Sequence, residues 1–166
     1  KTYAYLVAGV VFRRYRSRAG LPNQPLLIST SSIALQGAII HDYLPFLSKV
    51  MMADGMLDSP LRAVLRKGKS HYVCDARLMK RLQTANLDRK NPLAKAALLS
   101  MRDHLDLDMA PHLSGYDRER ICVPPTCDCG KTECRYLCYL DVCASERYAI
   151  QVCNHNLLLA DAIHQG

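Results

Sequence analysis

The beginning of the chain carries two apolar runs separated by a short break. Residues 3–12 are apolar almost all round and lead into a basic stretch at 13–18, which predicts a buried helix with a positively charged last turn. Gly20 and two prolines then end the helix. Residues 25–30 form a short apolar run, and this pattern is typical of a buried strand in a parallel sheet.

Two helices are expected after this strand. Ser31 and Ser32 are suitable N-caps for a helix over residues 33–40. Pro45 is placed to begin a second helix that runs through about residue 52 and ends near a glycine. The order helix, strand, helix corresponds to half of an α/β unit.

A second buried strand is predicted close to the end of the chain, at residues 148–154. The intervening residues are basic and contain a helix signal, Asn91-Pro92, which predicts a helix through about His104. We therefore expect an α/β frame formed by residues 1–60 and 148–166. A mainly helical, cysteine-bearing insertion at residues 61–147 interrupts it.

Composition is consistent with a folded protein that has a polyanionic partner. The 166 residues are 49% apolar, and the net charge is +7 with a pI of about 9.1. A basic surface favours nucleic acid, although many basic proteins do not bind it. No apolar run has membrane-spanning length, so we expect a cytoplasmic protein without a membrane partner.

Cysteines are concentrated in one part of the chain. Seven of the eight lie between Cys122 and Cys153, and four of these fall within residues 127–138. Cytosolic thiols stay reduced, which favours metal ligation or catalysis over disulfides. Four thiolates can hold zinc as well as an iron–sulfur cluster, and a chain with no metal is a third interpretation.

Three stretches in this order resemble a known family. They are Ile28-Ser-Thr-Ser-Ser-Ile-Ala-Leu-Gln36, Lys67-Gly-Lys-Ser-His-Tyr-Val-Cys74 and Val152-Cys-Asn-His-Asn-Leu-Leu-Leu-Ala-Asp161. Together they resemble the DinG branch of superfamily 2 DNA helicases, relatives of the XPD family. In that family the corresponding segments are motif Ia, the segment with the first iron–sulfur ligand, and the strand and Asn-His turn that close the iron–sulfur domain.

The resemblance implies part of a RecA-like motor domain with an iron–sulfur insertion, running from the end of Walker A to just before the DEAH box. It implies that Lys1 binds the β- and γ-phosphates of ATP and that Thr2 binds Mg²⁺. It also makes His155 a hydrogen-bonded structural residue of the Asn-His turn. The 166 residues contain no Asp-Glu-Ala-His sequence, so we expect no ATP hydrolysis by this chain alone.

The family holds a 4Fe–4S cluster with one distant and three clustered cysteines. Carried over to this sequence, the ligands are Cys74, Cys129, Cys134 and Cys138. The spacing from Cys134 to Cys138 is shorter than is usual in the family, and Cys127 competes with Cys129. Cys122 and Cys143 are spare thiols. Cys153, in an apolar strand, is expected to be a small buried hydrophobe.

Polar and basic residues around these motifs are candidates for DNA contact. The DNA-binding residues we predict are Ser29, Thr30, Ser31, Gln36, Lys67, Lys69 and Arg77. Lys80 and Arg81 extend the basic set, with Tyr72 or Tyr136 available for base stacking. The simpler interpretations are helix caps for the hydroxyl groups, a solvent-facing Gln36 and solvated surface charges.

The resemblance thus implies an ATP-dependent DNA helicase that moves 5′ to 3′ on single-stranded DNA and unwinds forked DNA. Replication and repair proteins are expected partners. A CRISPR-associated helicase with a degenerate iron–sulfur site, partnered by a CRISPR effector complex, is an alternative within the family. A rival from another class is a zinc-stabilised nucleic-acid-binding module without motor activity, and a degenerate motor kept as a scaffold is a third hypothesis.

Overall fold

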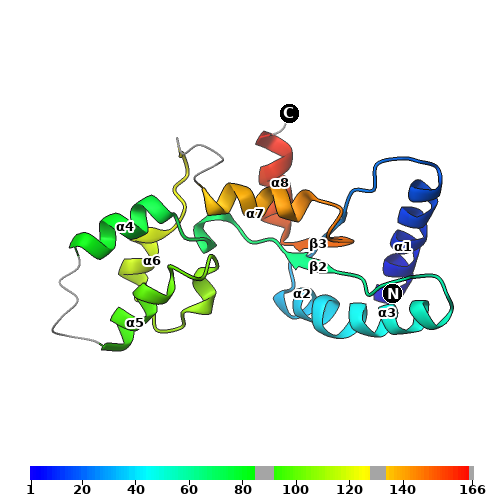
Figure 1. Ribbon diagram of the computed structural model, residues 1–166, viewed down its shortest axis with the longest axis horizontal. Helices are drawn as coiled ribbons and strands as arrows, with labels where there is room; N and C mark the ends of the chain where they lie inside the picture. Colours follow the sequence, from blue (N-terminus) through cyan, green and yellow to red (C-terminus); the bar gives the residue numbers. More distant parts are fainter. Residues whose placement is uncertain (85–91, 128–133, 165–166) are drawn as a thin grey trace. The chain divides into compact units, whose positions relative to one another are not determined.

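The computed structural model describes residues 1–84, 92–127 and 134–164. The chain divides into two compact units (Figure 1). Unit 1 comprises Lys1–Lys67 and Asp141–Gly166, and unit 2 comprises Gly68–Leu140. The second unit is therefore an insertion in the first, with bounds slightly narrower than the predicted residues 61–147.

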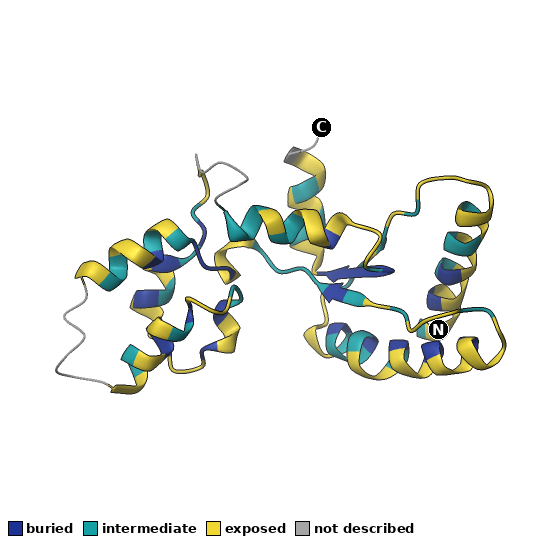
Figure 2. Cartoon of the chain, in the orientation of Figure 1, coloured by how far each residue is buried: buried dark blue, intermediate teal, exposed yellow. Residues whose placement is uncertain are grey.

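Unit 1 is an α/β fold built on a parallel sheet of three strands. The strand order is β1-β3-β2, with Leu26 opposite Ile150 in one pair and Ala63 opposite Ile150 in the other. All four residues of the central strand β3 are buried, as Figure 2 shows. The elements of unit 1 are α1 (Thr2–Arg18), β1 (Leu26–Ser29), α2 (Ile33–Ala38), a π-helix (Ile39–Tyr43), α3 (Leu44–Ala53), β2 (Ala63–Leu65), β3 (Ile150–Cys153) and α8 (His155–His164).

Helix α1 packs one face against the sheet. Leu6 and Val10 are buried there, and a Cβ at Gly9 would overlap the Cδ1 of Leu26, so glycine permits the close approach to β1. The other face, which includes Phe12 and Tyr15, is exposed. The predicted helix is confirmed, but its predicted burial all round is wrong, because nothing in the described residues covers the outer face.

The two predicted helices after β1 form one continuous helical run from Ile33 to Ala53. Ser32 caps it by accepting a hydrogen bond from the backbone N–H of Leu35 at 3.1 Å. Instead of a break, a π-helical segment over Ile39–Tyr43 precedes α3, and this wider turn accommodates Pro45, which has no N–H to donate within the run. Gly55, with φ of 67°, follows the end of the run as expected.

Strand β2 was not predicted from the sequence. It has three residues, and only Val64 is buried, so no long apolar run marks it. Its position shows that the sheet continues past residue 61, where the insertion was expected to begin. Among the described helices, none is long and apolar enough to cross a membrane.

Unit 2 is mainly helical. Its described elements are two 3₁₀ turns (Lys69–His71 and Leu107–Met109), α4 (Asp75–Thr84), α5 (Pro92–Ser100), α6 (Gly115–Ile121) and the first part of α7 (Arg135–Ala144). The core contains fully buried side chains of Leu78, Leu98, Met101, Leu107 and Ile121. Helix α5 ends four residues earlier than predicted, because residues 101–103 form turns. The predicted cap Asn91 lies outside the described residues.

Helix α7 lies in a part of the chain that was expected to be irregular. The stretch from Cys127 to Cys138 was expected to be irregular, yet a helix begins at Arg135 and carries Cys138 and Cys143. The packing of this helix gives the reason. Cys143 is 1% exposed, and its carbonyl oxygen accepts a hydrogen bond from the side-chain amide of Gln151 in β3 at 2.7 Å. The later half of the cysteine-rich stretch is therefore ordered secondary structure.

Candidate functional site

The carboxyl ends of β1 and β3 meet at one edge of the sheet. The Oγ of Ser29, the last residue of β1, lies 2.6 Å from the Nδ1 of His155, and the backbone N–H of Thr30 donates to the carbonyl of Cys153 at 3.0 Å. The interpretation of His155 as a hydrogen-bonded residue is thereby confirmed. In parallel α/β sheets, ligands bind outside this edge, so these polar residues lie where a site is expected.

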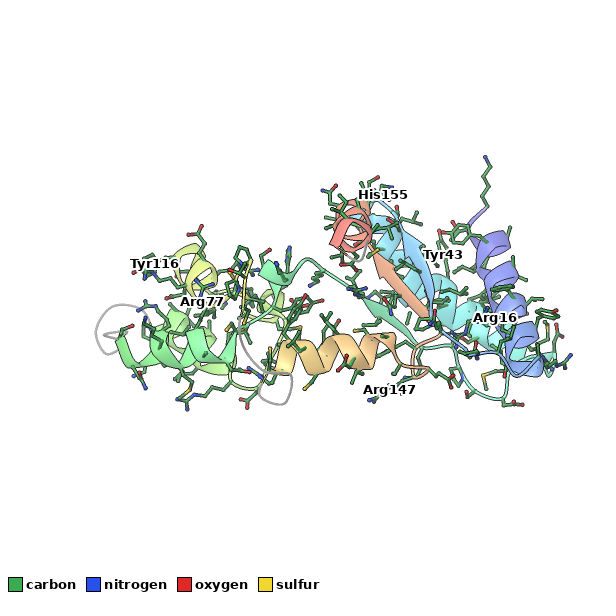
Figure 3. All side chains as sticks on the ribbon, turned by 90° about the horizontal axis from the view of Figure 1, so that it is seen from above. Arg16, Tyr43, Arg77, Tyr116, Arg147 and His155 are labelled. Atoms are coloured by element: carbon green, nitrogen blue, oxygen red, sulfur yellow. The ribbon has the colours of Figure 1, made fainter. Side chains whose placement is uncertain are left out.

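Helix α1 runs antiparallel to the strands and begins at the same edge. Its later residues contact segments that precede β1: Gly9 packs on Leu26, and Arg13 donates to the carbonyl of Gln24. In Figure 3, Arg16 and Arg147 lie toward one end of unit 1, and His155 lies toward the opposite end. A helix of 17 residues spans roughly 25 Å. Its N-terminus is therefore at the carboxyl edge.

Lys1 and Thr2 occupy this N-terminus. Lys1 is the N-cap residue, is exposed, and makes no side-chain capping hydrogen bond. The first backbone N–H groups of α1 and the positive end of its dipole are directed toward the carboxyl edge, an arrangement that favours a phosphate group.

The remaining predicted contacts of this edge have different environments. Gln36 is buried, at 7% exposed, and its side-chain amide donates to the carbonyl of Thr30 at 3.0 Å. It therefore does not face solvent, and its hydrogen bond holds the turn between β1 and α2. Ser31 is exposed, and the Oγ1 of Thr30 accepts from the backbone N–H of Ser32 at 3.2 Å.

Cys74 and Cys134 occupy equivalent positions in unit 2. Each is the residue immediately before a helix, α4 or α7, and each carbonyl accepts the first helical hydrogen bond, from Leu78 at 2.8 Å and from Cys138 at 3.1 Å. Cys134 and Cys138 are one turn apart and share a helix face. The positive end of a helix dipole favours negative charge at such positions, which suits thiolates.

An ion pair joins the two helix starts. The guanidinium of Arg135 donates to both carboxylate oxygens of Asp75, with nitrogen–oxygen distances of 2.5–3.0 Å, and it also donates to the carbonyls of Met101 and Arg102. Asp75 directly follows Cys74, and Arg135 directly follows Cys134. The pairing therefore connects the start of α4, which follows Cys74, with the start of α7, which follows Cys134.

Three tyrosines, one buried and two half-buried, line the same region. Tyr72 and Cys74 belong to one cluster, against which Tyr136 and Tyr139 pack, and both of these rings lie 5.2 Å from the ring of Tyr72. Tyr72 is 3% exposed, so it is a packing residue and not an available platform for a base. Cys74 itself is 7% exposed, whereas Cys134 is half-buried and Cys138 is exposed.

Thiolates suit a metal or iron–sulfur centre in chemistry, and three of the predicted ligands, Cys74, Cys134 and Cys138, are described, but the structure does not gather these three into one group. In residues 1–84, 92–127 and 134–164, no three His, Cys, Asp or Glu side chains form a group that could hold a metal ion. Cys129, one of the four predicted ligands, lies outside the described residues. Its competitor Cys127 is exposed.

The other cysteines have separate environments. Cys153 in β3 is 2% exposed, and burial raises the pKa of its thiol, although the Ser29 side chain and Arg66 oppose the shift. This confirms the interpretation of Cys153 as a small buried hydrophobe. The Sγ of Cys122 donates to the carbonyl of Glu119 at 3.4 Å. These two thiols therefore have local structural roles.

A basic cleft of about 480 Å³ lies between α4 and α6 of unit 2. Its lining contains four cationic side chains and no carboxylate, and Figure 3 shows Arg77 and Tyr116 close together there. We define the basic cleft by its lining residues, which are Arg77, Lys80, Arg81, Thr84, Tyr116 and Arg120. Guanidinium groups and an aromatic ring are the side chains that bind single-stranded nucleic acid.

Neighbouring contacts order the cleft. Arg77 donates to the carbonyls of Cys122 at 2.7 Å and Glu119 at 3.0 Å, and Arg81 pairs with Asp117 at 2.6 Å. The guanidinium carbons of Arg120 and Arg81 lie 4.4 Å and 5.2 Å from the centre of the Tyr116 ring. Sequence reasoning missed Tyr116 and Arg120, although the Ser-x-x-Asp signal at Ser114 marks the start of their helix.

The other predicted basic contacts lie outside the cleft lining. The Nζ of Lys69 donates to the carbonyl of Pro125 at 2.5 Å, and Lys67 is the last residue of the first segment of unit 1. Of the basic candidates named from the sequence, the structure places Arg77, Lys80 and Arg81 together in the cleft and leaves Lys67 and Lys69 outside its lining.

The fold and these sites define an α/β protein with a parallel sheet and an inserted, thiol-rich helical unit. No protein-family model and no curated protein sequence matched this chain. The functional assignment therefore depends on the residues and their geometry.

Proposed function

We propose that this chain is part of an ATP-dependent DNA helicase of the DinG type. Unit 1 contributes to a RecA-like motor domain, and unit 2 is its iron–sulfur insertion. The parallel sheet, the position of unit 2 between β2 and β3, and the thiols at the starts of α4 and α7 support this proposal.

One observation carries the proposal. The contacts of Gly9 with Leu26 and of Arg13 with Gln24 direct the N-terminus of α1, with Lys1 and Thr2, toward the carboxyl edge of the sheet, the edge at which Ser29 and His155 pair. In nucleotide-dependent motors the triphosphate binds at such a helix N-terminus, next to the strand ends that couple it to nucleic acid. The ammonium of Lys1 would balance phosphate charge, and the hydroxyl of Thr2 would bind Mg²⁺.

The residues of unit 2 would handle the nucleic acid. Cys74, Cys134 and Cys138, with Cys129 or Cys127, would hold a 4Fe–4S cluster, which when bound supplies a rigid cross-link between distant parts of the unit. The Asp75–Arg135 ion pair positions two of these cysteines. The basic cleft would bind the phosphates of a single strand as it passes the insertion.

A zinc-stabilised nucleic-acid-binding module is the second candidate, since the basic cleft and the thiols serve it equally well. Motor activity separates the two. In the protein that carries this sequence with the remaining motor motifs, Lys1→Ala is expected to reduce DNA-stimulated ATP hydrolysis at least a hundredfold, because the lysine stabilises the transferring phosphoryl group. A coupled phosphate-release assay measures this rate.

The control for that experiment is Lys49→Ala, an exposed lysine of α3 away from the carboxyl edge. It should leave the ATPase rate unchanged. The 166-residue chain by itself should show no DNA-stimulated turnover. Equal rates for the wild type and the Lys1→Ala protein would contradict the helicase proposal and favour the zinc-stabilised module.

The basic cleft gives a prediction for the isolated chain. Replacing Lys80 and Arg120 with glutamine should weaken binding of a fluorescent oligothymidine about tenfold at low salt, because two phosphate contacts are lost. The slope of log affinity against log salt should fall by about 1.4, at about 0.7 per phosphate for single strands. Fluorescence anisotropy across a salt series measures both quantities.

A double variant with the same loss of charge provides the control. Lys49 and Arg102 are exposed and do not line the basic cleft, so replacing both with glutamine should change affinity and salt slope much less. If the two double variants bind DNA equally well, the cleft is not the nucleic-acid interface, and overall charge alone explains binding.

A further inference from the structure

A second charged cavity, of about 500 Å³, lies in unit 1. It is lined by the end of α1, the segment after α3 and the residues before β3. We call it the arginine cavity, because five arginines line it: Arg13, Arg14, Arg18, Arg62 and Arg147. Its lining includes Ala149, next to β3, so it lies at the amino edge of the sheet, opposite the start of α1.

Local helix electrostatics account for only part of this arrangement. Basic residues in the last turn of α1 complement the helix dipole, and this explains Arg18 and its neighbours on the helix. Arg62 and Arg147 come from different parts of the chain and lie far from Arg18 in sequence. Their convergence on one cavity brings together charges that repel one another unless an anion is present.

The charge of the lining is not balanced by the protein. Asp58 and Glu146 are its carboxylates, so five cations against two anions leave a net charge of +3. Glu146 accepts a hydrogen bond from the backbone N–H of Asn23 at 3.3 Å. Glu146 also attracts the guanidinium of Arg13, whereas among the described residues no ion pair joins Asp58 to an arginine of the cavity.

The arginines divide into two groups by their contacts. Arg13 and Arg14 donate to the carbonyls of Gln24 and Met56, which holds the loops around the cavity in place. Arg18, Arg62 and Arg147 are exposed, and no carboxylate pairs with them among the described residues. The guanidinium groups of Arg18 and Arg147 are therefore available to a ligand, whereas the guanidinium carbon of Arg62 lies 5.6 Å from the centre of the Tyr148 ring.

The size of the cavity selects the kind of ligand. A volume of about 500 Å³ is within the range of small-molecule sites and larger than a single inorganic ion requires. Guanidinium groups bind phosphate oxygens in pairs with matched geometry. A compound with several phosphate charges can neutralise the excess of +3, whereas a single carboxylate cannot.

We propose that the arginine cavity binds a small, multiply charged phosphate compound of about nucleotide size. This site is separate from the phosphate site proposed at Lys1 and Thr2, and it does not depend on that function. The two sites lie at opposite edges of the same sheet. Their separation makes independent tests possible with a single probe.

The test titrates inorganic pyrophosphate into the full 166-residue chain. Isothermal titration calorimetry in buffer that contains EDTA measures the affinity. Wild-type protein should bind pyrophosphate, and Arg18→Gln and Arg147→Gln should each weaken binding about tenfold, the typical effect of removing one charge-assisted hydrogen bond. Both side chains are exposed, so neither variant should lower the melting temperature. Lys49→Gln should bind as the wild type does.

Each alternative result is decisive. Absence of pyrophosphate binding to the wild type would overturn the proposal, as would unchanged binding by a protein with both arginines replaced. Loss of binding in Lys1→Ala would assign the anion to the start of α1 instead. Tighter binding of citrate, or of an oligothymidine that depends on the same arginines, would replace the phosphate compound with a different ligand class.

Discussion

Replacing Cys74 with serine is expected to remove all cluster iron from the protein. Cys74 is the predicted ligand farthest from the others in sequence, and no other cysteine precedes Cys122 to take its place. A serine hydroxyl is a much poorer ligand for iron than a soft thiolate. The measurement is iron content per chain after anaerobic purification, together with the broad visible absorbance band of an iron–sulfur cluster.

Cys153→Ser is the matched control, because Cys153 is 2% exposed in β3 and burial raises the pKa of its thiol. Its iron content should equal that of the wild type. Wild-type protein that is colourless and contains one zinc would contradict the iron–sulfur proposal and leave the thiol site as a zinc site. Full iron loading of Cys74→Ser would show that the ligands lie entirely among the later cysteines.

Arg135→Ala is expected to destabilise unit 2 by about 2 kcal/mol. The change removes a bidentate contact with Asp75 and two hydrogen bonds to the carbonyls of Met101 and Arg102. The pair is about one-third exposed, at 35% and 36%, so water partly compensates for its loss. Urea denaturation measures the change in the free energy of unfolding.

Hydrogen exchange at individual amides distinguishes a local loss of stability at the two helix starts from a general loss of stability. Hydrogen exchange should become faster at the starts of α4 and α7 in the Arg135→Ala protein, and cluster or metal content should fall because Cys74 and Cys134 are no longer held together. Arg102→Ala removes an exposed arginine close to this contact and keeps its backbone carbonyl, so it should have little effect. Identical exchange in both variants would contradict the positioning role of Arg135.

The sequence predicts the elements of unit 1 that are apolar and locally bounded. Residues 26–29 and 150–153 are short apolar runs, and both form strands of one parallel sheet. The breaks after Arg18 and near Gly55 are marked by glycine and proline, and the structure ends helices there. Local signals of this kind need no knowledge of the tertiary structure.

Other features depend on tertiary contacts and could not be read from local pattern. Strand β2 is three residues long. It is recognised as a strand because it pairs with β3, since its own residues carry no strand pattern. The π-helical segment at 39–43 joins two helices that the position of Pro45 seemed to separate. Gln36 is polar, yet a hydrogen bond to the carbonyl of Thr30 allows its burial.

In the candidate sites, too, some residues could be predicted from the sequence and others only from tertiary contacts. The resemblance selected Cys74 and the clustered cysteines, but only the structure shows the ion pair between Asp75 and Arg135 beside them. Arg120 and Tyr116 join the basic cleft because α6 packs beside α4, a contact with no sequence signature. The arginine cavity draws its lining from three separated segments, so it was invisible before the fold was known.

The position of β3 in the sheet has a consequence for how the protein is made. Among the described strands, the latest in sequence lies between the other two, so neither β1 nor β2 can pair with β3 until residues 150–153 leave the ribosome. Throughout the synthesis of unit 2, two strand edges with parallel hydrogen-bonding groups are exposed to other nascent chains. Rapid folding of the helical unit, with its mostly local contacts, would shorten the time before the last strand closes the sheet.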